Sequence, residues 1–596
     1  MAGSAPKTGQ LASIAHMKIC DAIPFLQSTR GYNKQTLVAD LLAAGIVTVM
    51  LIPQSLAYAL LAGLPAEVGL YASILPLVVY ALLGSSRTLS VGPVAVASLM
   101  TAAALAEFAQ QGTAEYLAGA IVLALLSGLF LLLLGMLKLG VLANLLSHPV
   151  VSGFITASGI LIAFSQLKHV LGINLQGQTL VAMAGSLAAQ WTSTNTYSLL
   201  VGALVIAFLV WSRNGAARLL MRFSIQRSHA DLAAKAAPVV GVLVTIWLTQ
   251  FLELDNRGVA VVGSIPAGLP SLVFPQLTWS MVEQLYIPAI MISIIGYVES
   301  VSVGKTLAAK RRQKVDMNQE LIGLGAANVA SAISGAFPVT GGFSRSVVNF
   351  DAGAATQAAS IFAALGIALV SIVLTPALYY LPKATLAATI IVAVLSLIDI
   401  DILRKTWRYA KSDFVAVLVT ILATLLLGVE IGVGCGVLAS IALHLYRTST
   451  PHIAEVGLVE GTEHFRNVQR HHVSTSPDIL ILRVDESLFF ANIHHLENRI
   501  YDCVFQRDRI AHVILLCSAI NEIDTSALEI LEEINEQLTQ QGIRLHFSEI
   551  KGPVMDALER SGFLSRISGK VFLTVFEAFN TLRVVPAFSA ANTAEE

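Results

Sequence analysis

Charged residues are scarce in this sequence. Aspartate, glutamate, lysine and arginine together make up 13% of the 596 residues, whereas soluble domains contain roughly a quarter. The two signs nearly balance, since the formal net charge is −1, and no basic field favours nucleic acid. The scarcity of charge excludes an ordinary soluble protein, and the balance argues against a nucleic-acid-binding one.

Cysteine and catalytic motifs are scarce as well. The four cysteines show no metal-ligand spacing, and we interpret them as free thiols rather than disulfides. The sequence contains no G-x-S-x-G motif and no cluster of metal ligands, so we expect neither an enzyme nor a cofactor or metal. Residues 1–27 lack a continuous apolar run before a small-residue cleavage site, and we therefore expect no cleavable signal peptide.

Long apolar segments are abundant. Hydrophobic residues account for 55% of the chain, and apolar runs of about 18 residues, enough to cross a bilayer core, recur between residues 37 and 445. We expect a polytopic α-helical membrane protein, embedded in lipid, with several segments too short to span alone. Its approximately fourteen segments are predicted at residues 38–61, 68–84, 92–106, 115–136, 147–166, 197–212, 236–252, 283–304, 320–336, 343–350, 356–380, 384–399, 412–428 and 431–446.

Lysine and arginine are distributed unevenly over the loops between these segments. If the N-terminus is cytoplasmic, the inner loops contain sixteen of these residues, whereas the outer loops contain only Lys168, Arg257 and Lys383. Positive residues are enriched on the cytoplasmic side of membrane proteins. We therefore predict an even number of spans in the plasma or inner membrane, with the N-terminus and the C-terminal region in the cytoplasm.

The composition changes after Arg447. From about residue 475, short apolar runs such as DILILRV and HVILLCS alternate with amphipathic stretches such as SALEILEEINEQLTQQG, a pattern typical of an α/β domain. We divide the chain into a cytoplasmic N-terminal segment (1–35), a transmembrane transport domain (36–447), a linker (448–474) and a cytoplasmic α/β domain (475–590).

Two of the predicted membrane segments are short and interrupted by glycine or proline. SVGPVAVASLM begins at residue 90 and GGFSRSVVNF at residue 341, and they are the third segments of the first and second groups of seven. Matching broken segments in two halves indicate an inverted repeat with a substrate site between them. A half-helix that starts within the bilayer has unpaired N–H groups and a partial positive charge there, which an anion satisfies.

The residues at these two starts suit an anion. Pro93 fits the first turn of one half-helix, and Ser344 is either the N-cap of the other or a direct hydroxyl donor. Arg345 would compensate the charge of a bound anion, because charges within a membrane are costly and usually functional. The alternative is that Arg345 extends to the membrane surface or pairs with a carboxylate such as Asp351 or Glu299.

Glu299 is a second charge in an apolar segment, MISIIGYVESVSVG. Buried carboxyl groups are protonated more readily than exposed ones, and they can carry a proton through a transport cycle. Protonation of Glu299 as an anion enters would reduce the net charge that is moved. The alternatives are a sodium ligand and a permanent partner for Arg345.

Two membrane stretches resemble a known family. The stretch from PQSLAY to SVGPVAVASLM and the stretch NQELIGLGAANVASAISGAFPVTGGFSRSVVN are similar to signature regions of the SulP anion transporters, the sulfate permease family that includes pendrin and prestin. The tail resembles a STAS domain, so that the resemblance covers residues 35–585. It implies a seven-plus-seven inverted repeat with a core and a gate domain, and a homodimer. It also implies that the anion lies between half-helices 3 and 10, lined by Gln54, Tyr58, Pro93, Val94, Ser344 and Arg345.

The resemblance implies a secondary transporter of a small oxyanion, with sulfate carried by proton symport as the favoured interpretation. Glu299 matches an acidic position that the family links with proton coupling, whereas bicarbonate transporters of the family have an aspartate there for sodium. Val94 replaces a phenylalanine of many animal members, which weakens any inference from halide exchangers. For Gln54 and Tyr58 the alternative is helix packing.

Other functions remain open from the sequence. They are sodium-coupled transport of bicarbonate or another anion, an uncoupled anion channel or exchanger, and nucleobase transport, although nucleobase transporters normally lack a STAS tail. In the tail, NEIDTSALEIL resembles the STAS loop that is phosphorylated in anti-sigma antagonists. Ser526 lies at that position, at a helix start where phosphate is favoured. The alternative is that Asp524 or Thr525 simply caps the helix.

Overall fold

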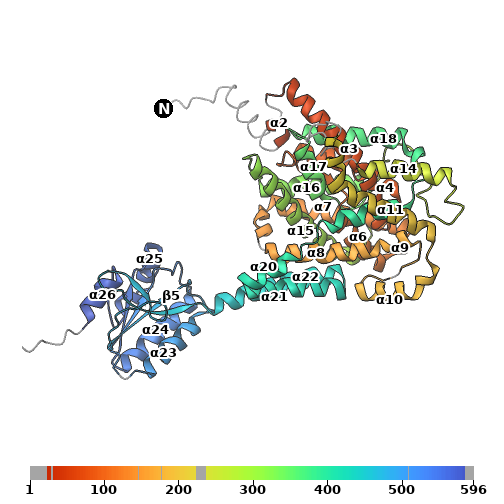
Figure 1. Cartoon of the computed structure of the whole chain (residues 1–596). Coiled ribbons are helices and arrows are strands. Elements are labelled where there is room, and N and C mark those ends of the chain that lie inside the picture. The colour runs from red at the N-terminus through yellow and green to blue at the C-terminus, as the bar shows by residue number, and fades with distance from the viewer. Residues whose placement is uncertain are drawn as a thin grey trace, which may run out of the picture. The chain divides into compact units, whose positions relative to one another are not determined.

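The computed structural model describes residues 23–28, 31–144, 147–175, 177–222, 237–507 and 509–583. Its contacts divide the chain into two compact units, residues 1–440 and 441–596. The first unit is helical and the second is mixed α/β (Figure 1). Of the predicted N-terminal segment, residues 1–22 lie outside the described residues, and the short helix α2 (Pro24–Ser28) follows them.

The first half of the helical unit has a helix at each of the seven predicted segments, with the second segment divided into two helices. Short helices α9 (Leu167–Leu171), α10 (Leu180–Gln190) and α12 (Ala217–Arg222) lie in its connections. The main helices are α3 (Lys34–Leu61), α4 (Ala66–Tyr71), α5 (Leu75–Leu83), α6 (Ala95–Phe108), α7 (Ala114–Met136), α8 (His148–Ser165), α11 (Thr196–Trp211) and α14 (Ala237–Phe251).

The second half repeats this order. Its main helices are α15 (Trp279–Lys310), α16 (Met317–Ile333), α17 (Phe343–Asp351), α18 (Ala358–Val373), α19 (Lys383–Leu395), α21 (Lys411–Leu427) and α22 (Val429–Ser449), and the short α20 (Asp401–Tyr409) precedes α21. Side chains predictable from the sequence cap several starts. Asn33 accepts a hydrogen bond from the backbone of Thr36 (2.9 Å) at α3, and Asp316 accepts one from that of Asn318 (2.8 Å) at α16.

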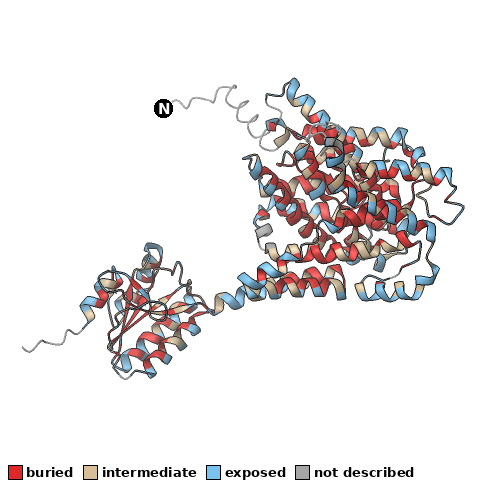
Figure 2. Cartoon of the chain, viewed as in Figure 1, coloured by how far each residue is buried: buried red, intermediate tan, exposed pale blue. Residues whose placement is uncertain are grey.

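Length and composition support a membrane location. Among the described residues, six helices are long and apolar enough to cross a bilayer, or seven if the bent pair α10–α11 is one span. Large apolar side chains are also exposed on this unit, and Figure 2 colours its exposed residues pale blue. Leu204 on α11 is 66% exposed, and Leu243 and Trp247 on α14 are 62% and 60% exposed. Such faces suit contact with lipid rather than water.

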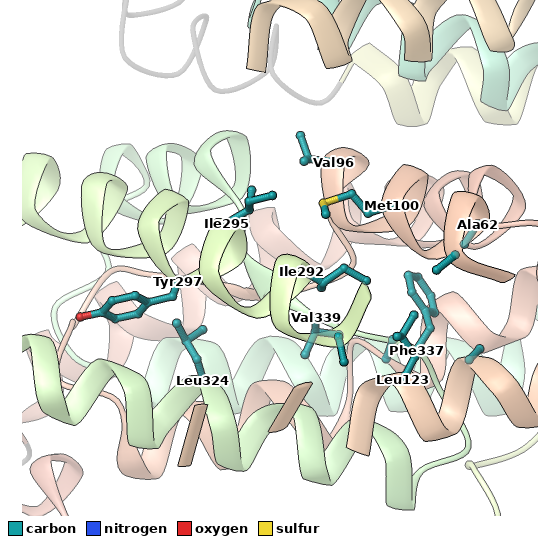
Figure 3. Close-up of a cluster of buried hydrophobic side chains, with 14 of the residues drawn as sticks. Ala62, Val96, Met100, Leu123, Ile292, Ile295, Tyr297, Leu324, Phe337 and Val339 are labelled. Atoms are coloured by element: carbon teal, nitrogen blue, oxygen red, sulfur yellow. The ribbon is translucent and has the colours of Figure 1, made fainter. Parts of the chain in front are cut away.

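Close helix packing forms the interior of the helical unit. Figure 3 shows one cluster of buried side chains, which includes Met100 of α6, Leu123 of α7 and Ile292 of α15. Helices α7 and α16 approach through glycines, because a Cβ at Gly128 would lie 2.7 Å from the backbone N of Val329. Small residues allow this approach where no hydrophobic effect drives helices together in lipid.

The second unit is a six-stranded sheet covered by helices on both faces. The strand order is β4-β3-β5-β6-β7-β8; β5 to β8 are parallel, and β3 is antiparallel to both neighbours. Alternate residues of β5 and β6 pack against α23–α25 on one face and α26 on the other. The bounds are β3 (Ile453–Leu458), β4 (Phe465–Asn467), β5 (Ile479–Val484), α23 (Ile493–Phe505), β6 (His512–Leu516), α24 (Thr525–Gln540), β7 (Arg544–Ser548), α25 (Gly552–Arg560), β8 (Val571–Phe572) and α26 (Val575–Leu582).

The structure corrects the predicted linker at residues 448–474. Helix α22 continues to Ser449, and the segment then contributes β3 and β4 to the sheet. These strands escaped detection because they are short and contain charged residues such as Glu455 and Arg466, so that they form no apolar run. The α/β unit therefore begins before residue 475, and residues 584–590 of its predicted range lie outside the described residues.

Candidate functional site

Helices α6 and α17 are too short to cross a bilayer alone. They have 14 and 9 residues, which correspond to about 21 Å and about 14 Å of helix, against ~30 Å for a hydrocarbon core. A two-residue strand precedes each helix, and β1 (Val91–Gly92) pairs antiparallel with β2 (Thr340–Gly341). The two half-helices therefore start beside one another, at a place formed by both halves of the unit.

The first N–H groups of both half-helices are unpaired. Val94 and Gly342 are the N-cap residues, and no side chain caps either helix. The first helical hydrogen bonds are Ser98 N to Val94 O at 2.9 Å and Ser346 N to Gly342 O at 3.1 Å. Among the described residues, the three N–H groups that follow each N-cap have no partner, which leaves six donors and two positive helix ends at this place.

The predicted position of Pro93 is wrong, and so is one of the two alternative roles predicted for Ser344. Pro93 precedes the N-cap Val94 instead of occupying the first turn of α6. Ser344 is the second residue of α17 and not its N-cap, which is Gly342. Ser344 is exposed, so its hydroxyl can still act as a direct donor. The general position of both half-helix starts is unaffected by these one- or two-residue shifts.

Arg345 lies in the first turn of α17 and is only 3% exposed. Among the described residues, its Nη1 and Nη2 atoms have no hydrogen-bond partner, and Arg345 forms no ion pair with a carboxylate. The burial contradicts an extension to the membrane surface, and among the described residues neither Asp351 nor Glu299 forms an ion pair with Arg345. A buried guanidinium with unpaired donors is costly unless an anion accompanies it.

The Arg345 guanidinium lies against Gly92 of β1. A Cβ added at Gly92 would overlap Nη1 and lie 3.3 Å from Cζ. A Cβ added at Gly342 would lie 3.1 Å from Nε of the same side chain and 3.4 Å from Val94 Cγ2. The arginine thus reaches from the second half-helix to the segment that leads into the first, and glycine is needed where it crosses.

Three polar side chains fix the crossing of β1 and β2. Ser346 Oγ accepts a hydrogen bond from Ser90 N at 3.0 Å, and Ser300 Oγ on α15 accepts one from Gly341 N at 2.8 Å. Asn349 Nδ2 donates to a backbone carbonyl before β1 at 3.1 Å. None of the three was predicted from the sequence, where their only signal is that they are polar within apolar segments.

Residues of α3 and α15 border the same place. Arg345 interacts electrostatically with Tyr58 of α3 and with Glu299 of α15, and both of these residues are 7% exposed. Glu299 forms no hydrogen bond or ion pair with a described residue. Gln54, one turn before Tyr58, has a buried Oε1 atom that finds no partner in the described part of the chain. The structure therefore brings the predicted residues of α3, α15 and α17 together.

A cavity of about 560 Å³ reaches Gln54 and Ser344. Its other walls come from α11, α14 and α19 and from Arg213, whose Nη1 donates to Val392 O at 3.4 Å. Arg345 and Glu299 do not line this cavity, so they lie deeper than Gln54 and Ser344. The cavity therefore reaches the start of α17.

The α/β unit favours the simpler interpretation of the predicted phosphorylation loop. Asp524 is the N-cap of α24, and its Oδ1 accepts a hydrogen bond from Ala527 N at 2.8 Å. Its Oδ2 accepts another from Phe490 N at 2.9 Å. Ser526 is exposed in the first turn, and its phosphorylation stays a prediction.

Paired half-helix starts in a helical membrane unit, followed by a separate α/β unit, define a membrane protein of the seven-plus-seven repeat fold with an added α/β domain. Residues 37–420 match the Sulfate permease family and residues 471–578 match the STAS domain. The chain belongs to the sulfate permease family and is an anion transporter rather than an enzyme. The family and the fold class expected from the sequence are confirmed.

Relatives are similar over nearly the whole chain. Identity is 35% with the chloroplastic sulfate transporter 4.1 of Arabidopsis thaliana, covering 95% of this chain and 83% of that one. It is 33% with a "probable sulfate transporter" of Mycobacterium tuberculosis, covering 94% and 98%. The solved structure of the murine anion transporter Slc26a9 in its inward-facing state superposes with a TM-score of 0.85 at 24% identity, covering 97% of this chain and 96% of that one.

Proposed function

We propose that this protein carries sulfate into the cell by proton symport, and that the sulfate lies between the starts of α6 and α17. The observation that carries the proposal is the buried, unpaired guanidinium of Arg345 beside two uncapped half-helix starts. A doubly charged oxyanion accepts several hydrogen bonds and compensates both the arginine and the helix ends. The names of the relatives support sulfate as the substrate.

Each proposed site residue has a separate role. The N–H groups after Val94 and Gly342 and the guanidinium of Arg345 bind the anion, while the hydroxyl of Ser344 and the amide of Gln54 face the entry cavity. Pro93 and Tyr58 shape the walls. Glu299 accepts the coupled proton, since a protonated carboxyl group offsets part of the charge that enters with sulfate.

Sulfate uptake by proteoliposomes tests the coupling role of Glu299. In the wild type, an inwardly directed proton gradient is expected to drive accumulation of labelled sulfate above equilibrium. Glu299→Gln keeps the shape but cannot release a proton, so gradient-driven accumulation is lost while sulfate–sulfate exchange continues. Glu430→Gln is a matched control, because Glu430 starts another membrane helix, α22.

The other results of this experiment are equally informative. Accumulation that requires a sodium gradient and ignores pH would identify sodium as the coupling ion, and preference for bicarbonate over sulfate would then favour the alternative substrate. A lower melting temperature of Glu299→Gln without substrate would show that Glu299 mainly neutralises Arg345, because an unpaired buried charge costs several kcal/mol. Undiminished proton-driven accumulation in Glu299→Gln would refute the coupling role.

We also propose a cell-membrane location with both termini in the cytoplasm and a homodimeric assembly. The excess of lysine and arginine in the predicted inner loops supports the orientation. Labelling of single cysteines introduced into the α15–α16 connection, from each side of the membrane, tests the orientation. Light scattering of the purified protein in detergent tests the dimer.

A further inference from the structure

A second, larger cavity lies in the helical unit away from the half-helix starts. Its volume is about 740 Å³, and none of its lining residues lines the cavity at Gln54 and Ser344. Four parts of the unit form its walls: α2, the connection between α5 and β1, the connection between α15 and α16 with the adjoining helix ends, and Gln357 before α18. We call it the basic pocket, for the three cations Arg87, Arg312 and Lys314 that line it.

These cations have no partners within the part of the protein that the structure describes. Arg87, Arg312 and Lys314 are exposed, and none of the three side chains forms a hydrogen bond or ion pair with a described residue. One carboxylate, Asp316, also lines the pocket. This carboxylate caps the start of α16, where its Oδ1 accepts hydrogen bonds from two backbone N–H groups at 2.8 and 3.1 Å. The pocket therefore has excess positive charge.

The backbone at Arg312 is unfavourable for this residue type. Its φ is +54°, in the left-handed region that glycine adopts without penalty and a long side chain does not. The turn is held by hydrogen bonds from the backbone N–H groups of Arg312 and Gln313 to α15, at 3.2 and 2.9 Å. These two bonds end α15 in a left-handed helix C-terminal turn, and the turn places an arginine in the pocket wall.

Gln357, which also lines the pocket, has a buried polar atom. Gln357 is 2% exposed, and its Nε2 donates to Gly84 O at 2.9 Å. Its Oε1 has no partner among the described residues. A buried amide oxygen without a donor is rare in native proteins. A hydroxyl group of a ligand would supply the missing donor.

We propose that the basic pocket binds a phosphate-bearing molecule with hydroxyl groups, at a site separate from the transported anion. A guanidinium group binds two phosphate oxygens at once, and an ammonium group adds a point charge. The volume lies within the range of about 300–1,000 Å³ for small-molecule sites and exceeds the needs of a single oxyanion. A phospholipid headgroup and a soluble phosphate compound share this chemistry.

Occupancy of the pocket would act on the transport site. Arg87 lies four residues before the first residue of β1, and Arg312 follows α15, the helix that contains Glu299. A phosphate group bound by both arginines links these two segments. The ligand is therefore expected to stabilise the helical unit and to change the rate of transport without being transported.

Melting of the full-length protein in nanodiscs tests the proposal, with sulfate present throughout so that the transport site is filled. One arm adds inorganic pyrophosphate to discs of phosphatidylcholine, and the other replaces part of that lipid by phosphatidylglycerol. The pocket variant combines Arg87→Gln, Arg312→Gln and Lys314→Gln. The matched control combines Arg404→Gln, Lys405→Gln and Arg408→Gln, which neutralise three exposed cations of α20, none of them in the pocket wall.

The expected result is a higher melting temperature of the wild type and of the α20 control in at least one arm. The pocket variant is expected to bind roughly 100-fold more weakly, because each lost cation reduces the affinity by about a factor of ten or less. Stabilisation by pyrophosphate identifies a soluble ligand, and stabilisation by phosphatidylglycerol alone identifies a headgroup. No stabilisation in either arm, or equal loss in both variants, overturns the proposal. The single variant Arg87→Gln gives the same comparison if the triple variant does not fold.

Discussion

Replacement of Gly92 by alanine tests the position of the Arg345 guanidinium directly. A Cβ at Gly92 would overlap Nη1, so the guanidinium must retreat by roughly 1 Å to restore ordinary contact. The φ angle of Gly92 is not positive, and alanine therefore adds no backbone strain. The expected consequence is a displaced charge in an otherwise intact fold.

The size of the effect follows from the charge separation. At an effective dielectric constant of about 20, two unit charges attract by about 4 kcal/mol at ~4 Å and by about 3.3 kcal/mol at ~5 Å. Gly92→Ala should therefore weaken sulfate binding by about 3-fold, since a factor of ten corresponds to about 1.4 kcal/mol. Arg345→Ala removes the charge entirely and should weaken binding by up to about 1,000-fold by the same arithmetic.

Binding of labelled sulfate to the purified protein measures both variants, together with their melting temperatures. Gly185→Ala on α10 is the matched control, because no atom lies within 4 Å of a Cβ at that position. Wild-type affinity in Gly92→Ala, combined with lost binding in Arg345→Ala, would show that the guanidinium does not lie against Gly92 when sulfate is bound. Wild-type affinity in Arg345→Ala would refute the site itself.

Three further predictions concern stability and the α/β unit. Glu320→Ala should lower the free energy of unfolding by about 3–6 kcal/mol, measured by thermal melting. The reason is that the buried carboxylate accepts hydrogen bonds from Tyr80 Oη at 2.7 Å and from the backbone N–H groups of Ser85 and Ser86 at 2.8 and 3.0 Å. An unchanged melting temperature would contradict this role. Deletion of residues 450–596 should leave the helical unit folded but reduce sulfate uptake or dimer content; full activity of an unchanged dimer would exclude a regulatory tail. Burial and the neighbouring imidazole lower the pKa of His546 to about 4, so this side chain takes up a proton less readily in the folded α/β unit than in the unfolded chain. The free energy of unfolding should therefore be highest above pH ~6.5. It should decrease by about 1–2 kcal/mol as the pH falls toward 4, after allowance for solvent screening. Acid titration of residues 441–583, which have their own core, should show a weaker pH dependence after replacement of this histidine by phenylalanine.

The main membrane helices and three strands of the tail could be located from the sequence alone. Apolar runs located every main membrane helix, because a segment must be apolar over the bilayer thickness whatever its neighbours are. The apolar runs of the tail located β5, β6 and β7, and Gly542, with φ +77°, follows the end of α24 as its position predicts. The short, glycine-interrupted segments located the two half-helices, since their length already prevents a complete span.

Only the tertiary structure decided what surrounds Arg345. Three features of the site depend on parts of the chain that are distant in sequence. The Nη atoms of Arg345 lack partners among the described residues, the guanidinium lies against Gly92, and Ser346 bonds to Ser90, which is 256 residues away. The same holds for β3, which has no strong apolar run and becomes a strand by pairing with β5. The hydrophobic pattern of a segment indicates which of its residues are buried. Which other segment packs against it depends on the packing of the whole chain.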